Sequence, residues 1–330
     1  ILSKRLWEKV DESPAIQSYY DQFPNVDTFN GTASFVDNHT VAIALNDGSS
    51  VTLTGDKVFV ATGGRTNIPS LPGLEEAGYL TSESFFGPSY PKKPYQSLII
   101  IGGGTKVTMV QHNVRLLPKE DPAVSAFILK QFQRYGMDIR LNKDTVSVSQ
   151  RDGLKVLSFR DRTTGEEGEV AAEEILVAPG IRPMTELLHL ENTDVRLDKR
   201  GYIETNEFLE TTAENIWALG DVNGLAPFRH KANYEAEILA HNLFSGNGPE
   251  TWRWADYDAV PAVTYTYPEA AHVGLTEDQA VKKGYDVETA INHYSASAKG
   301  YAMGYEPGEE DPRVGKLGID QKTQFNIDAH

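Results

Sequence analysis

An aspartate stands directly after a short apolar run at residues 216–221, Ile-Trp-Ala-Leu-Gly-Asp. Such a run predicts a buried strand of a parallel sheet that ends at a ligand crevice. In that crevice Asp221 could accept hydrogen bonds from sugar or ribitol hydroxyl groups. A helix is predicted from Lys231 to Phe244, and its first amides, including that of Ala232, would present partial positive charge to an electron-rich ligand edge. The alternative is that Asp221 only orders its own turn.

A glycine turn is the second candidate site. Gly102, Gly103 and Gly104 follow the apolar run at residues 97–101, as in a fingerprint whose backbone amides approach a pyrophosphate. In that fingerprint a crossover helix leads to the next strand, yet here the next apolar run, residues 105–110, follows at once. Parallel strands need a connection of about a dozen residues. Either the two runs form a hairpin, or a crossover helix is missing after Gly104, and we expect the second.

The elements around these sites occur twice. A hairpin is predicted at residues 41–54, and a buried strand with an Ala-x-Gly end and an arginine follows at residues 57–65. The same order recurs at residues 146–159 and 174–183. We interpret this order as an internal repeat of one dinucleotide-binding type of domain. Two unrelated hairpins in an α/β protein are the alternative.

Two further helices are predicted from their caps. Asp121 caps and Pro122 opens a helix that ends before Gly136, and a strand follows at residues 137–141. A capping box begins at Thr276. It opens a short helix in a third unit of different style, with strand-like runs at residues 260–269, 287–291 and 314–319.

Composition narrows the possible partners. The formal charge is −16, with 47 acidic against 31 basic residues, which argues against nucleic acid or an anionic membrane as a partner. No apolar run approaches the roughly 20 residues that span a bilayer. A diffusely acidic surface is typical of proteins in a salt-saturated cytoplasm, and an ordinary acidic enzyme is the alternative. Cysteine is absent, so these residues supply no thiolate nucleophile.

Two long motifs in the right order carry a resemblance to a known family. Residues 217–221 and 267–277, together with the glycine turns, resemble the FAD-dependent pyridine nucleotide-disulfide oxidoreductases, which include glutathione reductase, dihydrolipoamide dehydrogenase and mercuric reductase. Residues 230–237 and 300–303 are most similar to the mycothione reductase branch. In salt-loving archaea that branch resembles reductases of bis-γ-glutamylcystine, which would fit the acidic surface.

The resemblance implies roles for single residues. Asp221 would bind the flavin ribitol, and the amides near Lys231 and Ala232 would lie by the flavin pyrimidine edge. Thr62 and Gly63 would lie near the ADP part of FAD. The nicotinamide dinucleotide would be held at its pyrophosphate by Gly102, Gly103 and Gly104, with Ala178 and Gly180 lining that site.

The choice of nicotinamide cofactor depends on the end of the second strand. A carboxylate there would bind a ribose 2′-hydroxyl, and cationic groups would accept a 2′-phosphate. Gln111 and His112 follow Val110, with Arg115 beyond, and no acid is present among them. We therefore expect NADPH, with NADH still possible. The alternative is that His112 and Arg115 belong to a solvated loop.

The chain also departs from the family. The N-terminal FAD fingerprint, the paired cysteines, the helix after Gly104 and the C-terminal His-Glu pair are absent, so we assign no catalytic residue and expect segments to be missing. There is no initiator Met, and an earlier targeting segment remains possible. No metal site is expected.

The resemblance implies an α/β fold with two Rossmann-like, three-layer domains and a C-terminal α+β interface domain. The expected divisions are FAD-binding at 1–93 and 184–258, NAD(P)-binding at 94–183, and interface at 259–330. The expected protein is a cytoplasmic homodimer that passes hydride from NADPH through FAD to a small-molecule disulfide. Dihydrolipoamide dehydrogenase and mercuric reductase are alternatives within the class. A non-catalytic nucleotide-binding scaffold is the alternative outside it.

Overall fold

The computed structural model describes residues 13–86, 95–101, 107–246, 248–305, 314–323 and 325–330. By its internal contacts the chain forms two compact units. Unit 1 comprises Ile1–Asn67, Ser82–Pro94 and Gly180–Tyr257. Unit 2 comprises Ile68–Thr81, Tyr95–Pro179 and Asp258–His330. Each unit is therefore assembled from three separate stretches of sequence.

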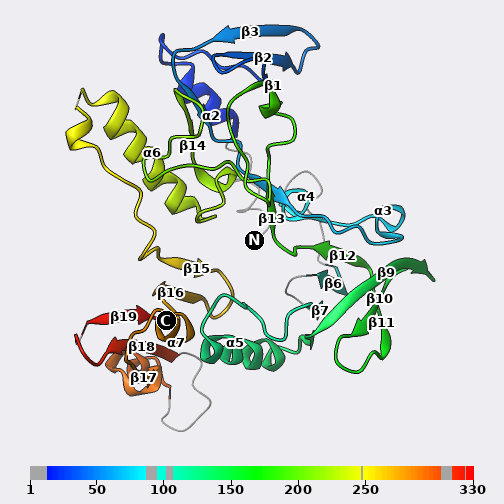
Figure 1. Cartoon of the computed structure of the whole chain (residues 1–330). Coiled ribbons are helices and arrows are strands. Elements are labelled where there is room, and N and C mark those ends of the chain that lie inside the picture. The colour runs from blue at the N-terminus through cyan, green and yellow to red at the C-terminus, as the bar shows by residue number, and fades with distance from the viewer. Residues whose placement is uncertain (1–12, 87–94, 102–106, 247, 306–313, 324) are drawn as a thin grey trace. The chain divides into compact units, whose positions relative to one another are not determined.

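Unit 1 contains an antiparallel meander and two short strand pairs (Figure 1). The meander has the order β1-β2-β3. Strand β4 pairs in parallel with β14, and β5 pairs antiparallel with β13. The strands are β1 (Gly31–Phe35), β2 (Thr40–Leu45), β3 (Ser50–Thr54), β4 (Val58–Val60), β5 (Gly64–Thr66), β13 (Ile181–Pro183) and β14 (Ile216–Ala218). The predicted first hairpin and the predicted parallel strand before Asp221 are confirmed.

The helices of unit 1 include the one predicted after Asp221. Helix α6 (Arg229–Phe244) begins two residues before the predicted start and packs Ile238 and Leu239 against Trp217 of β14. The remaining helices are α2 (Ser13–Tyr20), α4 (Ser82–Phe85), and the 3-10 turns η1 (Leu190–Asn192), η2 (Gly220–Val222) and η3 (Pro249–Thr251). A core that includes Val60, Ile203 and Ile216 lies beneath the β4–β14 pair.

Unit 2 contains a parallel sheet of order β12-β6-β7-β8. Its strands are β6 (Leu98–Ile101), β7 (Val107–Val110), β8 (Asp138–Arg140) and β12 (Glu174–Val177). Strand β6 is buried throughout, as its unbroken apolar sequence predicts. Because Leu98 lies opposite Val107 in a parallel register, the hairpin alternative for residues 97–110 is wrong. The glycines at 102–104 lie outside the described residues.

Helix α5 (Pro122–Arg134) in unit 2 begins as predicted. The Asp121 side chain accepts a hydrogen bond from the Ala123 amide at 2.9 Å, and Pro122 occupies the first turn. Val124 and Ile128 point into a core with Met109 of β7. A short helix, α3 (Leu74–Ala77), also belongs to this unit.

A second meander precedes the last parallel strand. It has the order β11-β10-β9, with β9 (Lys143–Arg151), β10 (Leu154–Asp161) and β11 (Glu167–Ala172). Strand β12 then pairs in parallel with β6, just as β4 follows the first meander and pairs in parallel with β14. The succession of elements that suggested an internal repeat is therefore present in both units.

The C-terminal part of unit 2 is an antiparallel sheet of order β15-β16-β19-β18-β17. Its strands are β15 (Ala262–Thr264), β16 (Ala270–Gly274), β17 (Val287–His293), β18 (Val314–Asp320) and β19 (Asn326–Ala329). Helices α7 (Glu277–Lys282) and α8 (Ala298–Ala302) and the turn η4 (Tyr294–Ala296) accompany it. The capping box predicted at Thr276 is confirmed, because its hydroxyl accepts from the Gln279 amide while the Gln279 side chain accepts from the Thr276 amide.

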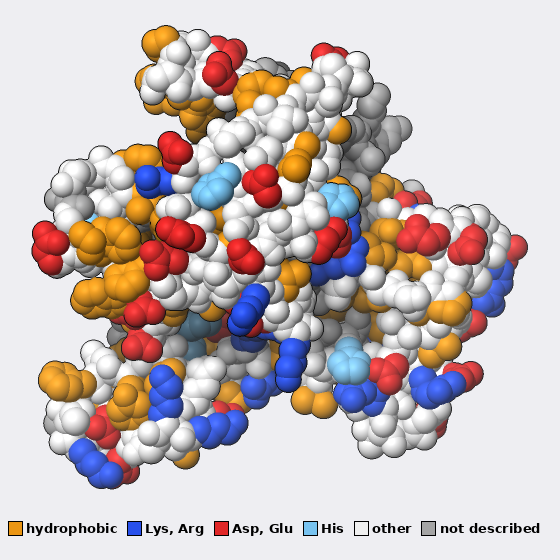
Figure 2. Space-filling model, turned by 45° about the horizontal axis from the view of Figure 1, so that its top comes forward, with side chains coloured by type: hydrophobic (Ala, Val, Ile, Leu, Met, Phe, Trp, Pro, Cys, Tyr) orange, Lys and Arg blue, Asp and Glu red, His pale blue; other side chains and the backbone are white. Residues whose placement is uncertain are grey.

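Figure 2 shows acidic side chains spread over the visible face and not gathered into one patch. Within the described residues, no helix is both long enough and apolar enough to cross a bilayer.

Candidate cofactor-binding site

The β4–β14 pair brings two glycine-containing turns to one sheet edge. Both strands end there, and the Leu219 amide donates to the Val60 carbonyl at 3.1 Å. A Cβ on Gly64 would lie 3.1 Å from the Arg182 carbonyl oxygen and 3.6 Å from the Asp221 Cβ. The turn after β4 and Asp221 after β14 therefore lie close together, as expected for the carboxyl ends of neighbouring parallel strands.

Asp221 is half-buried on the 3-10 turn η2. Burial raises the pKa of its carboxyl group above the ordinary value. Among the described residues no side chain or amide donates to this carboxylate, so nothing in that part of the chain compensates its partial desolvation. A partly buried carboxylate without a donor costs free energy unless a ligand supplies one. Its position thus suits a bound group that carries hydroxyls.

Glu235 holds the turn that carries Asp221, and sequence reasoning missed it. Its side chain is 1% exposed. One carboxylate oxygen accepts from the Gly220 amide at 2.6 Å, and the other accepts from the Tyr257 hydroxyl at 2.6 Å. The Asn223 side-chain amide donates more weakly, at 3.4 Å. Burial, together with Glu235, raises the pKa of Tyr257, which keeps that phenol protonated as a donor.

Lys231 and Ala232 lie in the first turn of α6, but their amides are already occupied. Both donate to the Phe228 carbonyl oxygen, at 2.9 and 3.0 Å. The helix begins earlier than predicted and uses both amides internally, and the place of the amides near Lys231 and Ala232 by a ligand edge stays a prediction. The Lys231 ammonium is buried, donates to the Asp256 carbonyl and lies 4.1 Å from the Tyr257 ring centroid, and burial lowers its pKa.

Thr62 and Gly63 form the turn after β4. The Thr62 hydroxyl donates to the Met184 carbonyl at 2.9 Å, and the Met184 amide donates to the Gly63 carbonyl at 3.0 Å. Gly63 has φ +69°, in the left-handed region that favours glycine. The turn is thereby fixed to the segment after β13. Nearby, Arg65 and Glu186 form an exposed ion pair at 2.6 Å.

In unit 2, Ala178 stands where β12 leaves the sheet edge. Its amide donates to the Ile101 carbonyl at 2.7 Å, so it lies beside the last described residue before the glycine turn. Gly180 belongs to unit 1, with φ +127°, and its carbonyl accepts from the Asn67 amide at 2.9 Å.

Gln111, His112 and Arg115 follow β7 at the same sheet edge. The Gln111 amide donates to the Arg140 carbonyl at 2.9 Å, and the Arg115 guanidinium donates to the Pro118 carbonyl at 3.1 Å. No acid stands among these residues in the sequence, but one lies beside them in the fold. His112 Nδ1 lies 2.7 Å from Asp144 Oδ1, a carboxylate that β9 contributes from 32 residues further along the chain.

A guanidinium accompanies this pair. Arg162 Nε lies 3.5 Å from Asp144 Oδ1, and its guanidinium donates to the His112 carbonyl at 3.4 Å. All three side chains are exposed. The end of β7 therefore presents an imidazole and a guanidinium around one carboxylate, with Arg115 nearby in sequence. Pattern reading along one strand could not find Asp144 or Arg162, because both come from the following meander.

Comparisons with known proteins identify the family of this chain. A family model described as pyridine nucleotide-disulphide oxidoreductase matches residues 1–256, and the model of the dimerisation domain of these proteins matches residues 260–324. The chain belongs to the pyridine nucleotide-disulphide oxidoreductase family. The family uses FAD and NAD(P)H, and its fold is the predicted one, with dinucleotide-binding and dimerisation domains.

Individual relatives fall in several branches. A mercuric reductase of Staphylococcus aureus is 33% identical over 318 residues, which are 92% of this chain and 55% of the relative. A dihydrolipoyl dehydrogenase of Mycobacterium bovis is 31% identical over 293 residues, 84% of this chain and 61% of the relative. This chain thus spans only about half the length of the first of these curated relatives.

Among solved structures, a Cu(II) complex of the HOCl-induced flavoprotein disulfide reductase RclA from Escherichia coli superposes with a TM-score of 0.81. It is 28% identical and matches 94% of this chain and 69% of that one.

Proposed function

We propose that this chain forms the FAD- and nicotinamide-binding part of a flavoprotein disulfide reductase. The observation that carries the proposal is Asp221, a half-buried carboxylate without a donor among the described residues, at the edge where β4 and β14 end. FAD would supply the acceptor of hydride from a nicotinamide dinucleotide. Asp221 would accept hydrogen bonds from ribitol hydroxyls, and Thr62 and Gly63 would lie by the ADP part.

The residues after β7 would select the nicotinamide cofactor. The guanidinium groups of Arg162 and Arg115, with the His112 imidazole beside Asp144, would accept a 2′-phosphate. NADPH is therefore our proposed reductant. Asp144 could instead accept from a ribose 2′-hydroxyl, so NADH remains the alternative. The residues that we propose to surround this cofactor remain Gly102, Gly103, Gly104, Ala178 and Gly180.

The acceptor we propose is a low-molecular-weight disulfide of the mycothione or bis-γ-glutamylcystine type. The relatives named mercuric reductase and dihydrolipoyl dehydrogenase keep those two activities as alternatives. Thiol–disulfide exchange needs a thiolate, and this sequence contains no cysteine. The reductase activity thus belongs to a protein that carries a cysteine pair beyond these residues. We further propose that the protein is a homodimer and that it works in the cytoplasm of a salt-rich host.

The absence of cysteine also supports one rival, a nucleotide-binding scaffold that performs no chemistry. Intact mass decides whether the natural protein is longer than these 330 residues. Anaerobic mixing with NADPH then separates the two proposals, because flavin reduction by hydride needs no cysteine. Bleaching of the flavin absorption supports the reductase. Nucleotide binding without bleaching supports the scaffold, and a failure to bind FAD contradicts the reductase proposal.

Asp221→Asn tests the residue that carries the proposal. The loss of a charge-assisted hydrogen bond should weaken FAD binding by about tenfold or more. Asp56→Asn is the matched control, since Asp56 is exposed and lies before β4, at the opposite end of the same strand pair. Flavin fluorescence titration measures both variants. Equal FAD affinity in the two variants would show that Asp221 only orders its own turn.

A further inference from the structure

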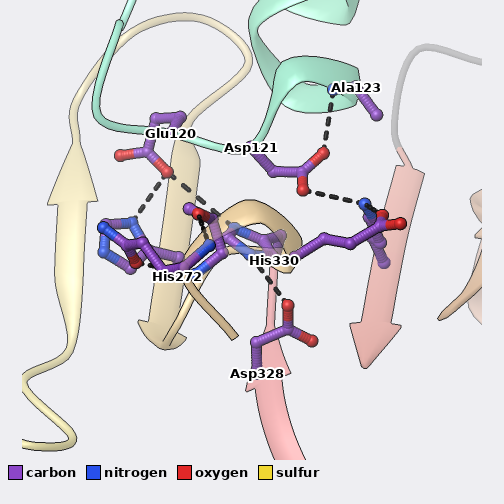
Figure 3. Close-up of polar contacts among 10 residues, drawn as sticks. Glu120, Asp121, Ala123, His272, Asp328 and His330 are labelled. Atoms are coloured by element: carbon purple, nitrogen blue, oxygen red, sulfur yellow. Dashed lines mark hydrogen bonds and ion pairs between the residues drawn. The ribbon is translucent and has the colours of Figure 1, made fainter. Parts of the chain in front are cut away.

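Two histidines and two acids meet inside unit 2. Glu120 precedes the N-cap of α5, His272 lies on β16, and Asp328 and His330 lie on and after β19 (Figure 3). The elements that carry them are held firmly. Strands β16 and β19 pair with Gly274 opposite Asp328, and continuation of that register places His330 opposite His272.

The ligand atoms of three of these residues converge. Glu120 Oε2 lies 2.7 Å from His272 Nδ1 and 4.0 Å from His330 Nδ1. One ligand atom from each of Glu120, His272 and His330 lies within 4.8 Å of the others. Zinc–nitrogen and zinc–oxygen bonds are about 2.0–2.2 Å long, so donors bound to one ion lie roughly 3–4 Å apart. Small side-chain shifts would bring this set to that spacing.

Two members of this cluster, His330 and Asp328, have buried polar atoms without hydrogen-bond partners. The His330 side chain is 0% exposed, and neither of its ring nitrogens makes a hydrogen bond. Both carboxylate oxygens of Asp328 are likewise buried and unbonded, although Oδ2 lies 3.4 Å from His330 Nε2. Buried polar groups nearly always have hydrogen-bond partners in native proteins. Buried polar atoms that lack a partner and face into a cluster therefore indicate a ligand-binding site.

We propose that this cluster is a binding site for a divalent transition-metal ion of the zinc type. Glu120 would supply a carboxylate oxygen, and His272 and His330 would each supply a ring nitrogen. Asp328 lies by Nε2, on the far side of the His330 ring from Glu120, where it would receive the remaining N–H and fix the tautomer. Two imidazoles and a carboxylate suit zinc better than magnesium or calcium, which prefer all-oxygen sites.

The ion would cross-link the start of α5 to the C-terminal sheet. These elements already share a core, in which Ala270 of β16 packs with Val124 and Ile128 of α5. Three protein ligands leave a fourth tetrahedral position for water. The site uses none of the residues that we assign to FAD or to the nicotinamide cofactor, so zinc binding and flavin binding can be measured separately on the same protein.

Competition with a chromophoric chelator tests the proposal on the full chain freed of metal. One equivalent of Zn²⁺ should bind. His272→Ala and Glu120→Gln should each weaken that binding by about tenfold or more. His293→Ala is the matched control, because His293 is exposed on β17 of the same sheet, and it should leave the affinity unchanged. Loss of binding in the control, or equal binding in all four proteins, would overturn the proposal.

A measurement on the unaltered protein tests the proposal even if the variants fail to fold. Zinc K-edge absorption should show a nitrogen and oxygen shell that includes two imidazoles. A shell without imidazole would overturn the proposal, and so would the absence of stoichiometric zinc binding, which would leave the cluster as an internal ion-pair network.

Discussion

At the scale of single residues, a buried acid supports Asp221, the acid that we propose to bind the flavin. Glu235 bonds the Gly220 amide, one residue before Asp221, and thereby fixes the turn on which Asp221 stands. The sequence does not reveal this role, since Glu235 occupies a helix position that reads as an ordinary polar residue. Its partner amide lies 15 residues earlier, and only the packing of α6 on η2 brings the two together.

Glu235→Ala should lower the free energy of unfolding by about 3 kcal/mol, because it leaves a buried amide and the Tyr257 hydroxyl unsatisfied. It should also weaken FAD binding, since the Asp221 turn loses its support. Urea unfolding and flavin titration measure the two effects. Glu237→Ala, an exposed acid on the same helix, should change stability by no more than about 0.5 kcal/mol. A similar loss in both variants would contradict the assigned role.

At the scale of elements, a buried ion pair anchors the start of α5 to β18. Lys316 Nζ lies 2.8 Å from Asp121 Oδ2 and 2.6 Å from Glu277 Oε2, and both Lys316 and Asp121 are almost fully buried. Burial by itself would raise the pKa of Asp121, but hydrogen bonds from Lys316 and the Ala123 amide outweigh burial and hold that pKa below its usual range. The aspartate therefore serves both as a helix cap and as a tie to the C-terminal sheet.

Lys316→Met should cost about 3 kcal/mol of stability at neutral pH, since it leaves the Asp121 carboxylate buried without its cation. Because the pKa of Asp121 is lowered in the fold, the pair stabilises the protein above the unfolded value near 4 and this contribution disappears as pH falls through the folded value. The difference from the unaltered protein should thus shrink in acid. Lys322→Met, at an exposed lysine, is the control. Urea midpoints that do not depend on pH in this way would contradict the argument.

Local signals allowed most elements to be predicted. The cap at Asp121, the capping box at Thr276 and the hairpin turns depend on neighbouring residues, which the sequence displays directly. The candidate sites depend on partners far along the chain, such as Asp144 beside His112. Periodicity and spacing contain no information about such pairs until the sheet registers are known.

At the scale of the whole molecule, the net charge should determine how thermal stability changes with salt concentration. The formal charge is −16 and acidic side chains are spread over the face seen in Figure 2, so the folded chain repels itself at low ionic strength. Raising KCl from 0.1 M to 1 M shortens the screening length from about 10 Å to about 3 Å. The thermal midpoint should therefore rise by several degrees over this range. A flat response to KCl would contradict adaptation to a salt-rich cytoplasm.

The pairing of β4 with β14 has a consequence for how the chain folds during synthesis. Residues 58–60 must wait for residues 216–218 before this parallel pair can form. The strands β6, β7, β8 and β12 of the other parallel sheet all leave the ribosome earlier, as do the strands of the second meander. Because domains generally fold as units as they emerge, the parallel sheet of unit 2 should be structured before β4 and β14 have paired. The proposed flavin site would then be completed late, in a folding intermediate whose parallel sheet in unit 2 has already formed.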